Sequence, residues 1–298
     1  VSVMRQGEMV AHRKTSDTNK EDLAELMVGR KVLLQIDKVP AKPGESILKV
    51  EKMNFVDDSN VLRVKNVNFE VHSGEILGIA GVSGNGQSEL MDLITGILPM
   101  QDGIIQIDEK IIEKDMNVDA AIMRKLGIGH VPEDRQRRGL VTEFSANENV
   151  ILGYHKDPSY NRFLEMDKVA IFKACEKNMK HFDVRPDNPF LKVSLFSGGN
   201  QQKLVVAREI ARDPKLLVVG QPTRGVDIGA IEFIHRQIIG MRDAGKAVLL
   251  VSVELDEILS LSDRILVMFE GQIMGEVLAN QASESKIGLL MAGIKEEA

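Results

Sequence analysis

Apolar and polar positions alternate in two different ways along the chain. In its second half, apolar runs typical of buried strands occupy residues 215–219, 247–253 and 263–269. Between them, apolar positions recur at helical spacing over residues 200–212 and 228–245. This succession of strands and helices predicts an α/β domain with a mainly parallel sheet and helices on both of its faces.

The first half of the chain has a different pattern. Residues 47–55 and 61–76 alternate apolar and polar positions, as antiparallel strands do, and residues 102–112 add another β segment, so an N-terminal antiparallel β subdomain is expected. Farther along, a helical pattern that is clearest over residues 166–182 predicts a helical subdomain inserted at about residues 141–200.

The first thirty residues repeat the pattern found at the other end of the chain. Residues 1–30 align without gaps on the segment that begins at Ile265, and both are predicted to form strand, glycine turn, strand, polar stretch and helix. This repeat predicts that residues 1–30 are the C-terminal tail of a preceding homologous domain, with chance similarity as the alternative. Two prolines and a glycine then predict a linker at residues 31–46, and the second domain covers residues 47–298. The coinciding positions are Val3 with Val267, Met4 with Met268, Gly7 with Gly271, Leu26 with Leu290, Met27 with Met291 and Gly29 with Gly293.

Composition narrows the class of protein. Hydrophobic residues make up 43% of the 298 residues, charged residues make up 28%, and the formal net charge of −6 argues against a nucleic-acid partner. We expect a cytoplasmic protein, because no apolar run is long enough to cross a bilayer and no signal peptide is recognisable. Cys175 is the only cysteine, so no internal disulfide is expected, and the histidines lack metal-ligand spacing, so no structural metal is expected.

A glycine-rich loop follows the apolar run at residues 75–80. Its spacing of Gly81, Gly86 and Ser88 is that of a P-loop, in which backbone N–H groups hold phosphates and a hydroxyl holds Mg²⁺. Gln87, however, stands at the position of the P-loop lysine. The candidate nucleotide-binding residues are Gly81, Ser83, Gly84, Asn85, Gly86, Gln87 and Ser88, with Ser88 as a weak Mg²⁺ ligand.

Two further motifs lie downstream of this loop. The small residues at 197–199 come just before an apolar helix, where free N–H groups and the helix dipole favour an anion. The apolar run at residues 215–219 ends in the polar turn "GQPTRGVD", where a Walker B strand would end.

In this order, and with "VPEDRQRRGL" between them, the motifs resemble those of an ATP-binding-cassette ATPase over essentially all of residues 47–298. They are most similar to the C-terminal cassette of the double ATPase subunit of ribose-type sugar and nucleoside importers. Within that group, the sequence "QPTRGVDIGAIEFIH" at residues 221–235 favours the nucleoside branch. The resemblance implies ATP and Mg²⁺ as ligands and a place at the cytoplasmic face of the membrane. It implies as partners a first cassette in the same full-length chain, transmembrane permease subunits and, indirectly, an extracellular substrate-binding protein.

The resemblance also assigns roles to individual residues. Asp227 matches the D-loop aspartate at the interface between cassettes, and Glu133 takes the Q-loop position, with a plain solvated turn as the alternative. Asp57 falls where an aromatic residue usually stacks on adenine, unless Phe55 serves there. The signature motif, which contacts the γ-phosphate of ATP held by the opposite cassette, is matched by Ser197, Gly198, Gly199, Asn200 and Gln201.

Four positions depart from the family pattern. Gln87 replaces the P-loop lysine, Gly220 the Mg²⁺-ordering aspartate, Gln221 the catalytic glutamate and Val253 the switch histidine. Phosphoryl transfer depends on positioned charge and an ordered water, and losing one such contact costs about 3–4 kcal/mol. We therefore expect no hydrolysis in this site, while binding of ATP and Mg²⁺ is expected to be weak or absent.

These features predict a degenerate second cassette that donates its signature motif in trans to the ATP site of the first cassette. Closure driven by that ATP would be coupled to the permease. The alternatives are a self-sufficient ATPase homodimer, a soluble ATPase that acts on ribosomes or DNA, and a structural module that binds no nucleotide. The short linker counts against the ribosomal class.

Overall fold

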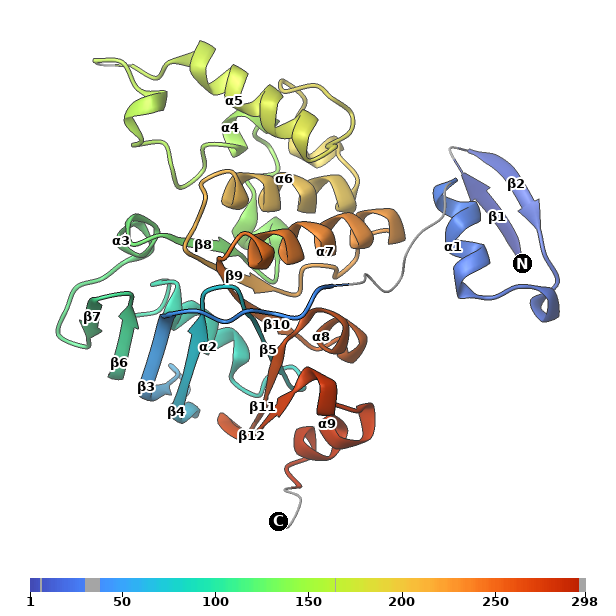
Figure 1. Ribbon diagram of the computed structural model, residues 1–298. Helices are drawn as coiled ribbons and strands as arrows, with labels where there is room; N and C mark the ends of the chain where they lie inside the picture. The colour runs from blue at the N-terminus through green and yellow to red at the C-terminus, as the bar shows by residue number, and fades with distance from the viewer. Residues whose placement is uncertain (6, 30–37, 164, 295–298) are drawn as a thin grey trace.

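The computed structural model describes residues 1–5, 7–29, 38–163 and 165–294, and a six-stranded sheet forms its centre (Figure 1). Five strands run parallel, and β12 pairs antiparallel with β11 at one edge. The prediction of a mainly parallel sheet is therefore confirmed. In sheet order the strands are β12 (Gln272–Leu278), β11 (Arg264–Phe269), β5 (Ile76–Ala80), β10 (Ala247–Ser252), β9 (Leu216–Gly220) and β8 (Ile128–Val131).

Both faces of this sheet are covered, which is why every residue of β5, β9 and β10 is buried. Successive residues belong to opposite cores: Leu217 and Leu250 pack with the helices of one face, and Val218 and Leu249 pack on the other. The helices of the first face are α5 (Lys168–His181), α6 (Gly198–Ile210), α7 (Ile228–Asp243), α8 (Leu255–Leu261) and α9 (Glu284–Met291).

The other face is covered by α2 (Gln87–Ile94) and by a four-stranded antiparallel sheet. The predicted strand at residues 61–76 is in fact two strands, because the chain turns at Gly74, whose φ of 69° suits glycine. The chain thereby passes from the antiparallel sheet into β5 of the central sheet. In sheet order the antiparallel strands are β4 (Leu62–His72), β3 (Ser46–Val56), β6 (Asp102–Ile107) and β7 (Lys110–Glu113).

The inserted region at residues 141–200 contains less regular helix than its pattern predicts. Of its described residues, only those of α5 form a long helix, because Pro158, Pro186 and Pro189 interrupt the rest. Two elements of the core were not predicted at all, β8 and α3 (Ala120–Lys125), since both are too short to show a period. The remaining short elements are α4 (Ala146–Asn149), η1 (Thr15–Asp17), the π-helical turn η2 (Arg135–Gly139), η3 (Pro158–Tyr160), η4 (Val193–Leu195) and η5 (Ala279–Gln281).

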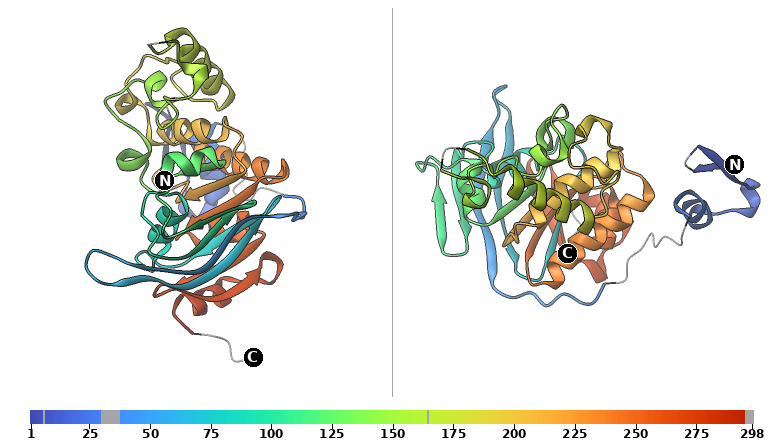
Figure 2. Two further views of the ribbon diagram at one scale, coloured as in Figure 1. Left: turned by 90° about the vertical axis from the view of Figure 1, so that its left-hand side faces the viewer. Right: turned by 90° about the horizontal axis from the view of Figure 1, so that it is seen from above.

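The N-terminal unit, residues 1–29, has the same order of elements as the C-terminal end of the chain. Gly7 and Gly271 turn the two hairpins with φ of 84° and 83°, and Gly29 and Gly293 follow the two helices with φ of 83° and 80°. In Figure 1 and in the right-hand view of Figure 2 the unit lies to one side of the main body, and its helix contacts α7. The predicted linker falls partly outside the described residues, and residues 38–45 form neither helix nor strand. The unit consists of β1 (Ser2–Arg5), β2 (Glu8–His12) and α1 (Lys20–Val28), which correspond to β11, β12 and α9.

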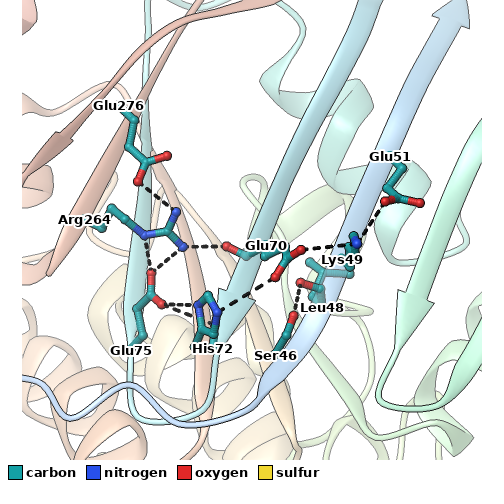
Figure 3. Close-up of polar contacts among 9 residues, drawn as sticks. All are labelled: Ser46, Leu48, Lys49, Glu51, Glu70, His72, Glu75, Arg264 and Glu276. Atoms are coloured by element: carbon teal, nitrogen blue, oxygen red, sulfur yellow. Dashed lines mark hydrogen bonds and ion pairs between the residues drawn. The ribbon is translucent and has the colours of Figure 1, made fainter.

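A polar network joins the two sheets where β4, β5 and β11 meet (Figure 3). The carboxylate of Glu75, which is 2% exposed, accepts a hydrogen bond from Arg264 at 2.8 Å and contacts Nδ1 of His72 at 2.9 Å. Arg264 also donates to the backbone oxygen of Glu70 at 2.6 Å and to Glu276 at 3.1 Å. One guanidinium therefore connects both sheets and neutralises a buried carboxylate.

Replacing Arg264 by methionine should lower the free energy of unfolding by about 3 kcal/mol, because the buried carboxylate of Glu75 would lose its guanidinium partner. Urea denaturation measures this change. As a control, Lys49→Met removes a cation of the same network that pairs with Glu51 and Glu70 near the surface, and it should change stability little. Equal effects of the two variants would contradict this interpretation of the network.

Candidate functional site

The P-loop connects β5 to α2 and keeps an anion-binding geometry. Gly84 and Gly86 have φ of 91° and 100°, and a Cβ at Gly86 would lie 2.1 Å from the backbone oxygen of Arg63. The backbone N–H groups of Gly86, Gln87 and Ser88 have no acceptor among the described residues. Because these groups point out of the N-terminus of a helix, they suit a phosphate.

Gln87 is folded back into the loop. Its side chain is 4% exposed, and its amide Nε2 donates to the backbone oxygen of Val82 at 3.2 Å. A Cβ at Gly81 would lie 2.1 Å from the same nitrogen, so Gly81 leaves the room in which the amide lies. Gln87 therefore stabilises the loop from within and brings no positive charge to a ligand.

Ser88 contacts the residue at the Q-loop position. Its Oγ donates to Oε2 of Glu133 at 2.7 Å. The two side chains line a polar cavity of about 50 Å³ together with Ser83, Gly84, Gln87, Gln221 and Val253. The structure thus brings together residues of four separate sequence motifs.

The far wall of this cavity lacks the groups that activate water. Gln221 follows β9 with a φ of 46°, a strained conformation for a residue with a side chain. Its Oε1 accepts a hydrogen bond from the backbone N–H of Val253 at 3.4 Å, and Val253 itself is apolar. Of the described residues that line the cavity, only Glu133 and Arg224 carry a charge. The cavity therefore has the shape of a nucleotide site without its usual carboxylate and imidazole.

The signature residues lie away from this cavity, at the N-terminus of α6. Ser197 caps the helix, and its Oγ accepts a hydrogen bond from Nδ2 of Asn200 at 2.9 Å. Gly199 lies against Asp227, whose Oδ2 is 2.5 Å from the place of a Cβ on that glycine. Ser197 is exposed, whereas Gln201 is buried and its amide donates to the backbone oxygen of Val193 at 3.0 Å. Ser197 at the start of α6 is therefore open to the surface, and Gln201 supports the motif from within.

Arg135 and Arg138 are site residues that sequence reasoning missed. Arg135 donates to the backbone oxygen of Arg224 at 2.7 Å, and Arg138 donates to both oxygens of Asp92 on α2 at 2.7 and 2.6 Å. Hydrogen bonding to Asp92 raises the pKa of Arg138. In the sequence these arginines belong to the run "EDRQRR", whose simplest interpretation is a solvated turn, so only the tertiary contacts distinguish them.

The structure offers no aromatic platform from Phe55. That side chain is 6% exposed and belongs to the core between the two sheets, so the suggestion that it stacks on adenine is wrong. Asp57 accepts hydrogen bonds from the backbone of Val61 at 2.9 Å and from Arg63 at 2.6 Å, which lower its pKa. Asp57 therefore closes the turn between β3 and β4.

A buried polar cluster supports β8, the strand that leads to Glu133. Glu209 of α6 accepts hydrogen bonds from Tyr154 at 2.6 Å, from Arg208 at 2.7 Å and from the backbone N–H of His130 at 3.2 Å. Burial lowers the pKa of His130 to about 4, and its Nε2 has no partner in the described part of the chain. His130 is therefore neutral in the folded protein near neutral pH.

The central sheet, the glycine-rich loop between β5 and α2, and the anion-binding N–H groups define a P-loop nucleotide-binding domain. The model of the ABC transporter family matches residues 64–224, and the chain belongs to this family as an ATP-binding domain. Among the described residues, no helix has the length and apolar character needed to cross a membrane.

Several relatives match nearly the whole chain. It is 43% identical over 294 residues to the guanosine import ATP-binding protein NupO of Bacillus subtilis, a match that covers 98% of this chain and 57% of the relative. It is 35% identical to the ribose import ATP-binding protein RbsA of Clostridium tetani, over 96% of this chain and 55% of the relative. The chain therefore spans little more than half the length of these relatives.

A solved structure shows the same fold. The crystal structure of a nucleotide-free ATP-binding cassette from an ABC transporter superposes with a TM-score of 0.68 at 24% identity, covering 83% of this chain and 96% of that one. This likeness confirms the predicted fold class of an ABC-type α/β core with an antiparallel β subdomain and a helical insertion.

The stability of the protein should fall as the pH decreases from about 6.5 to about 4. In this range His130 is protonated in the unfolded chain but stays neutral in the folded chain, where burial lowers its pKa to about 4. Between pH 7 and pH 5 this effect contributes about 2 kcal/mol to the free energy of unfolding. Urea denaturation of the wild type and of His130→Leu at both pH values measures it. The variant should lose this part of the pH dependence, and parallel curves would show that His130 is not its source.

Proposed function

We propose that the chain is the degenerate second cassette of an importer ATPase and that it donates its signature motif in trans to the ATP site of a first cassette. The observation that carries this proposal is a contrast within one molecule. The signature motif is well formed and Ser197 is exposed, whereas the chain's own site has Gln87, Gln221 and Val253 in place of the groups that drive hydrolysis.

The groups at the two places support a signature motif that acts in trans and a weak cis site. A γ-phosphate bound at Ser197 would meet the free end of α6, where helix N–H groups and the dipole favour an anion. In the cis site, in contrast, the amide of Gln87 is directed into the loop and no carboxylate stands at residue 221 to polarise water. Closure around ATP would then depend on the first cassette's site, with the cis site binding ATP and Mg²⁺ weakly.

The N-terminal unit supports a preceding cassette in the same chain. Its elements match β11, β12 and α9, but its apolar residues are not covered in the same way. Met4 is 59% exposed, whereas its counterpart Met268 is fully buried. β11 pairs with β5 along the edge that faces away from β12, and no described strand pairs with the corresponding edge of β1. A homologous core would supply both the strand and the cover.

The relatives support the wider assembly. They are ATP-binding proteins for import of guanosine, nucleosides or ribose, with identities of 43%, 42% and 35% respectively, so the nucleoside branch is favoured. We assign the subunit to a transporter of nucleosides or simple sugars, at the cytoplasmic face of the membrane. Its partners are the permease subunits and, through them, an extracellular substrate-binding protein.

The isolated chain should release no phosphate from Mg-ATP above background, because the cis site lacks the charges that stabilise the transition state. A phosphate-release assay over a range of protein concentrations measures this, since a homodimer would gain activity as concentration rises. Turnover of order 1 s⁻¹ would establish the self-sufficient homodimer in place of the proposed role.

Ser197→Arg in the full-length subunit, with both cassettes present, should reduce ATP hydrolysis by about tenfold or more, because it fills the place of the γ-phosphate contact and adds a bulky side chain at the interface. Ser194→Arg is a matched control, since Ser194 is also exposed and lies one turn before the motif. Circular dichroism verifies folding of both variants. Unchanged hydrolysis in folded Ser197→Arg would rule out donation in trans.

A further inference from the structure

The two glycines of the signature motif pack directly against the segment that leads into α7, the helix beside α6 (Figure 1). A Cβ added to Gly198 would lie 2.9 Å from the backbone oxygen of Gly225, and one added to Gly199 would lie 2.9 Å from Cβ of Ala230. Both neighbouring atoms belong to the backbone or are fixed directly to it, so the segments approach as closely as glycine allows. The start of α6 and the start of α7 therefore form one packed junction.

Arg135, the first residue of the turn η2, joins this junction from a third element. Its Nη1 donates to the backbone oxygen of Arg224 at 2.7 Å, and its Nη2 donates to that of Gly225 at 3.2 Å. The same Nη2 lies 2.7 Å from the place of a Cβ on Gly198, so the guanidinium also lies against the signature motif. Hydrogen bonds from a charged donor are stronger than those between neutral groups. One side chain therefore fixes the turn at residues 224–225 relative to the first residue of α6.

The contact suits the guanidinium of arginine in particular. Two nitrogens of one planar group bind the carbonyl oxygens of two successive residues, whereas lysine has a single ammonium on a flexible stem. The Nε of Arg135 is buried and has no partner in the described part of the chain. Within that part, the side-chain hydrogen bonds of Arg135 thus go to the backbone of this turn.

The turn that Arg135 holds leads two residues later to Asp227, the D-loop position. Oδ1 of Asp227 accepts a hydrogen bond from the backbone N–H of Ala230 at 2.9 Å, and its Oδ2 lies 2.5 Å from the place of a Cβ on Gly199. Ser197 and Asp227 are both exposed. The signature motif and the D-loop position are therefore neighbours on the surface, and the junction beneath them sets their relative placement.

We propose that Arg135 is a positioning residue for action in trans, because it fixes the signature motif and the D-loop position relative to each other before the opposite cassette arrives. The inference rests on the proposed donation of the signature motif and adds the residue that holds the donated surface together. In this role Arg135 touches no nucleotide and acts through Gly198 and the turn at residues 224–225. Segments that are fixed before association lose less freedom when the two cassettes close.

Hydrogen exchange in the isolated chain tests the junction itself. Arg135→Met keeps much of the apolar stem and removes the donors. The backbone amides of Val226 and Gln201, which close the turn and the first turn of α6, should then exchange at least about tenfold faster. Arg137→Met is the matched control, because Arg137 is an exposed arginine of the same turn η2, and it should exchange as the wild type does. Unchanged exchange of both amides in Arg135→Met would overturn the proposal.

ATP hydrolysis by the full-length subunit tests the consequence. Arg135→Met should lower kcat at least about tenfold and leave KM for ATP nearly unchanged, since the signature contact forms on closure around ATP that the first cassette already holds. Arg135→Lys should recover part of the rate, because it restores one charged donor. Arg137→Met should hydrolyse ATP as the wild type does. Thermal unfolding verifies that each variant is folded.

The outcomes separate this inference from the proposed function. If Ser197→Arg lowers hydrolysis and folded Arg135→Met does not, the signature motif acts in trans without Arg135 and the inference is overturned alone. If Ser197→Arg leaves hydrolysis unchanged, the proposed function fails and the inference fails with it. An equal loss in Arg135→Met and Arg137→Met would also overturn the inference, because the loss would then follow the charge of η2 and not the contact with residues 224–225.

Discussion

The packing of the turn after β8 is the constraint on which the site depends. Three successive contacts extend from this turn to two elements: Glu133 and Arg138 bind Ser88 and Asp92 at the two ends of α2, and Arg135 binds the "PTRG" turn after β9. Each involves a charged group, whose hydrogen bonds are stronger than those between neutral groups, and those of Glu133 and Arg138 are partly buried. A displacement of this turn would therefore move the P-loop helix and the end of β9 together.

The backbone groups of the P-loop and the side chains around it depend on different features of the sequence. The backbone geometry of the P-loop depends on glycines and on the buried amide of Gln87, and neither requires a charged ligand to be present. Hydrolysis, in contrast, requires side chains at defined distances from the reacting phosphate. The backbone geometry of the P-loop is therefore independent of the side chains at residues 221 and 253, which is why the loop is well formed beside Gln221 and Val253.

Much of the fold was predictable because it is encoded locally. The continuous apolar runs of β5, β9 and β10 and the periodic helix α7 carry their structure in adjacent residues, as does the repeat at the two ends of the chain. β8 was missed because four residues that include His130 show no recognisable period. Spacing indicated the residues of the candidate site, but it did not indicate the contact of Arg135 with the backbone of Arg224, since these residues meet only after β8 and β9 have paired.

The N-terminal unit shows the same limit of local information. Its sequence specifies a hairpin and a helix as clearly as the C-terminal end does, yet a two-stranded hairpin has little independent stability in water. In the C-terminal end, β11 gains its stability by pairing with β5 and burying Met268 in the core between the sheets. β1 and Met4 have neither contact among the described residues. The same order of elements therefore has different surroundings at the two ends of the chain, and the preceding cassette proposed above would pair with the exposed edge of β1.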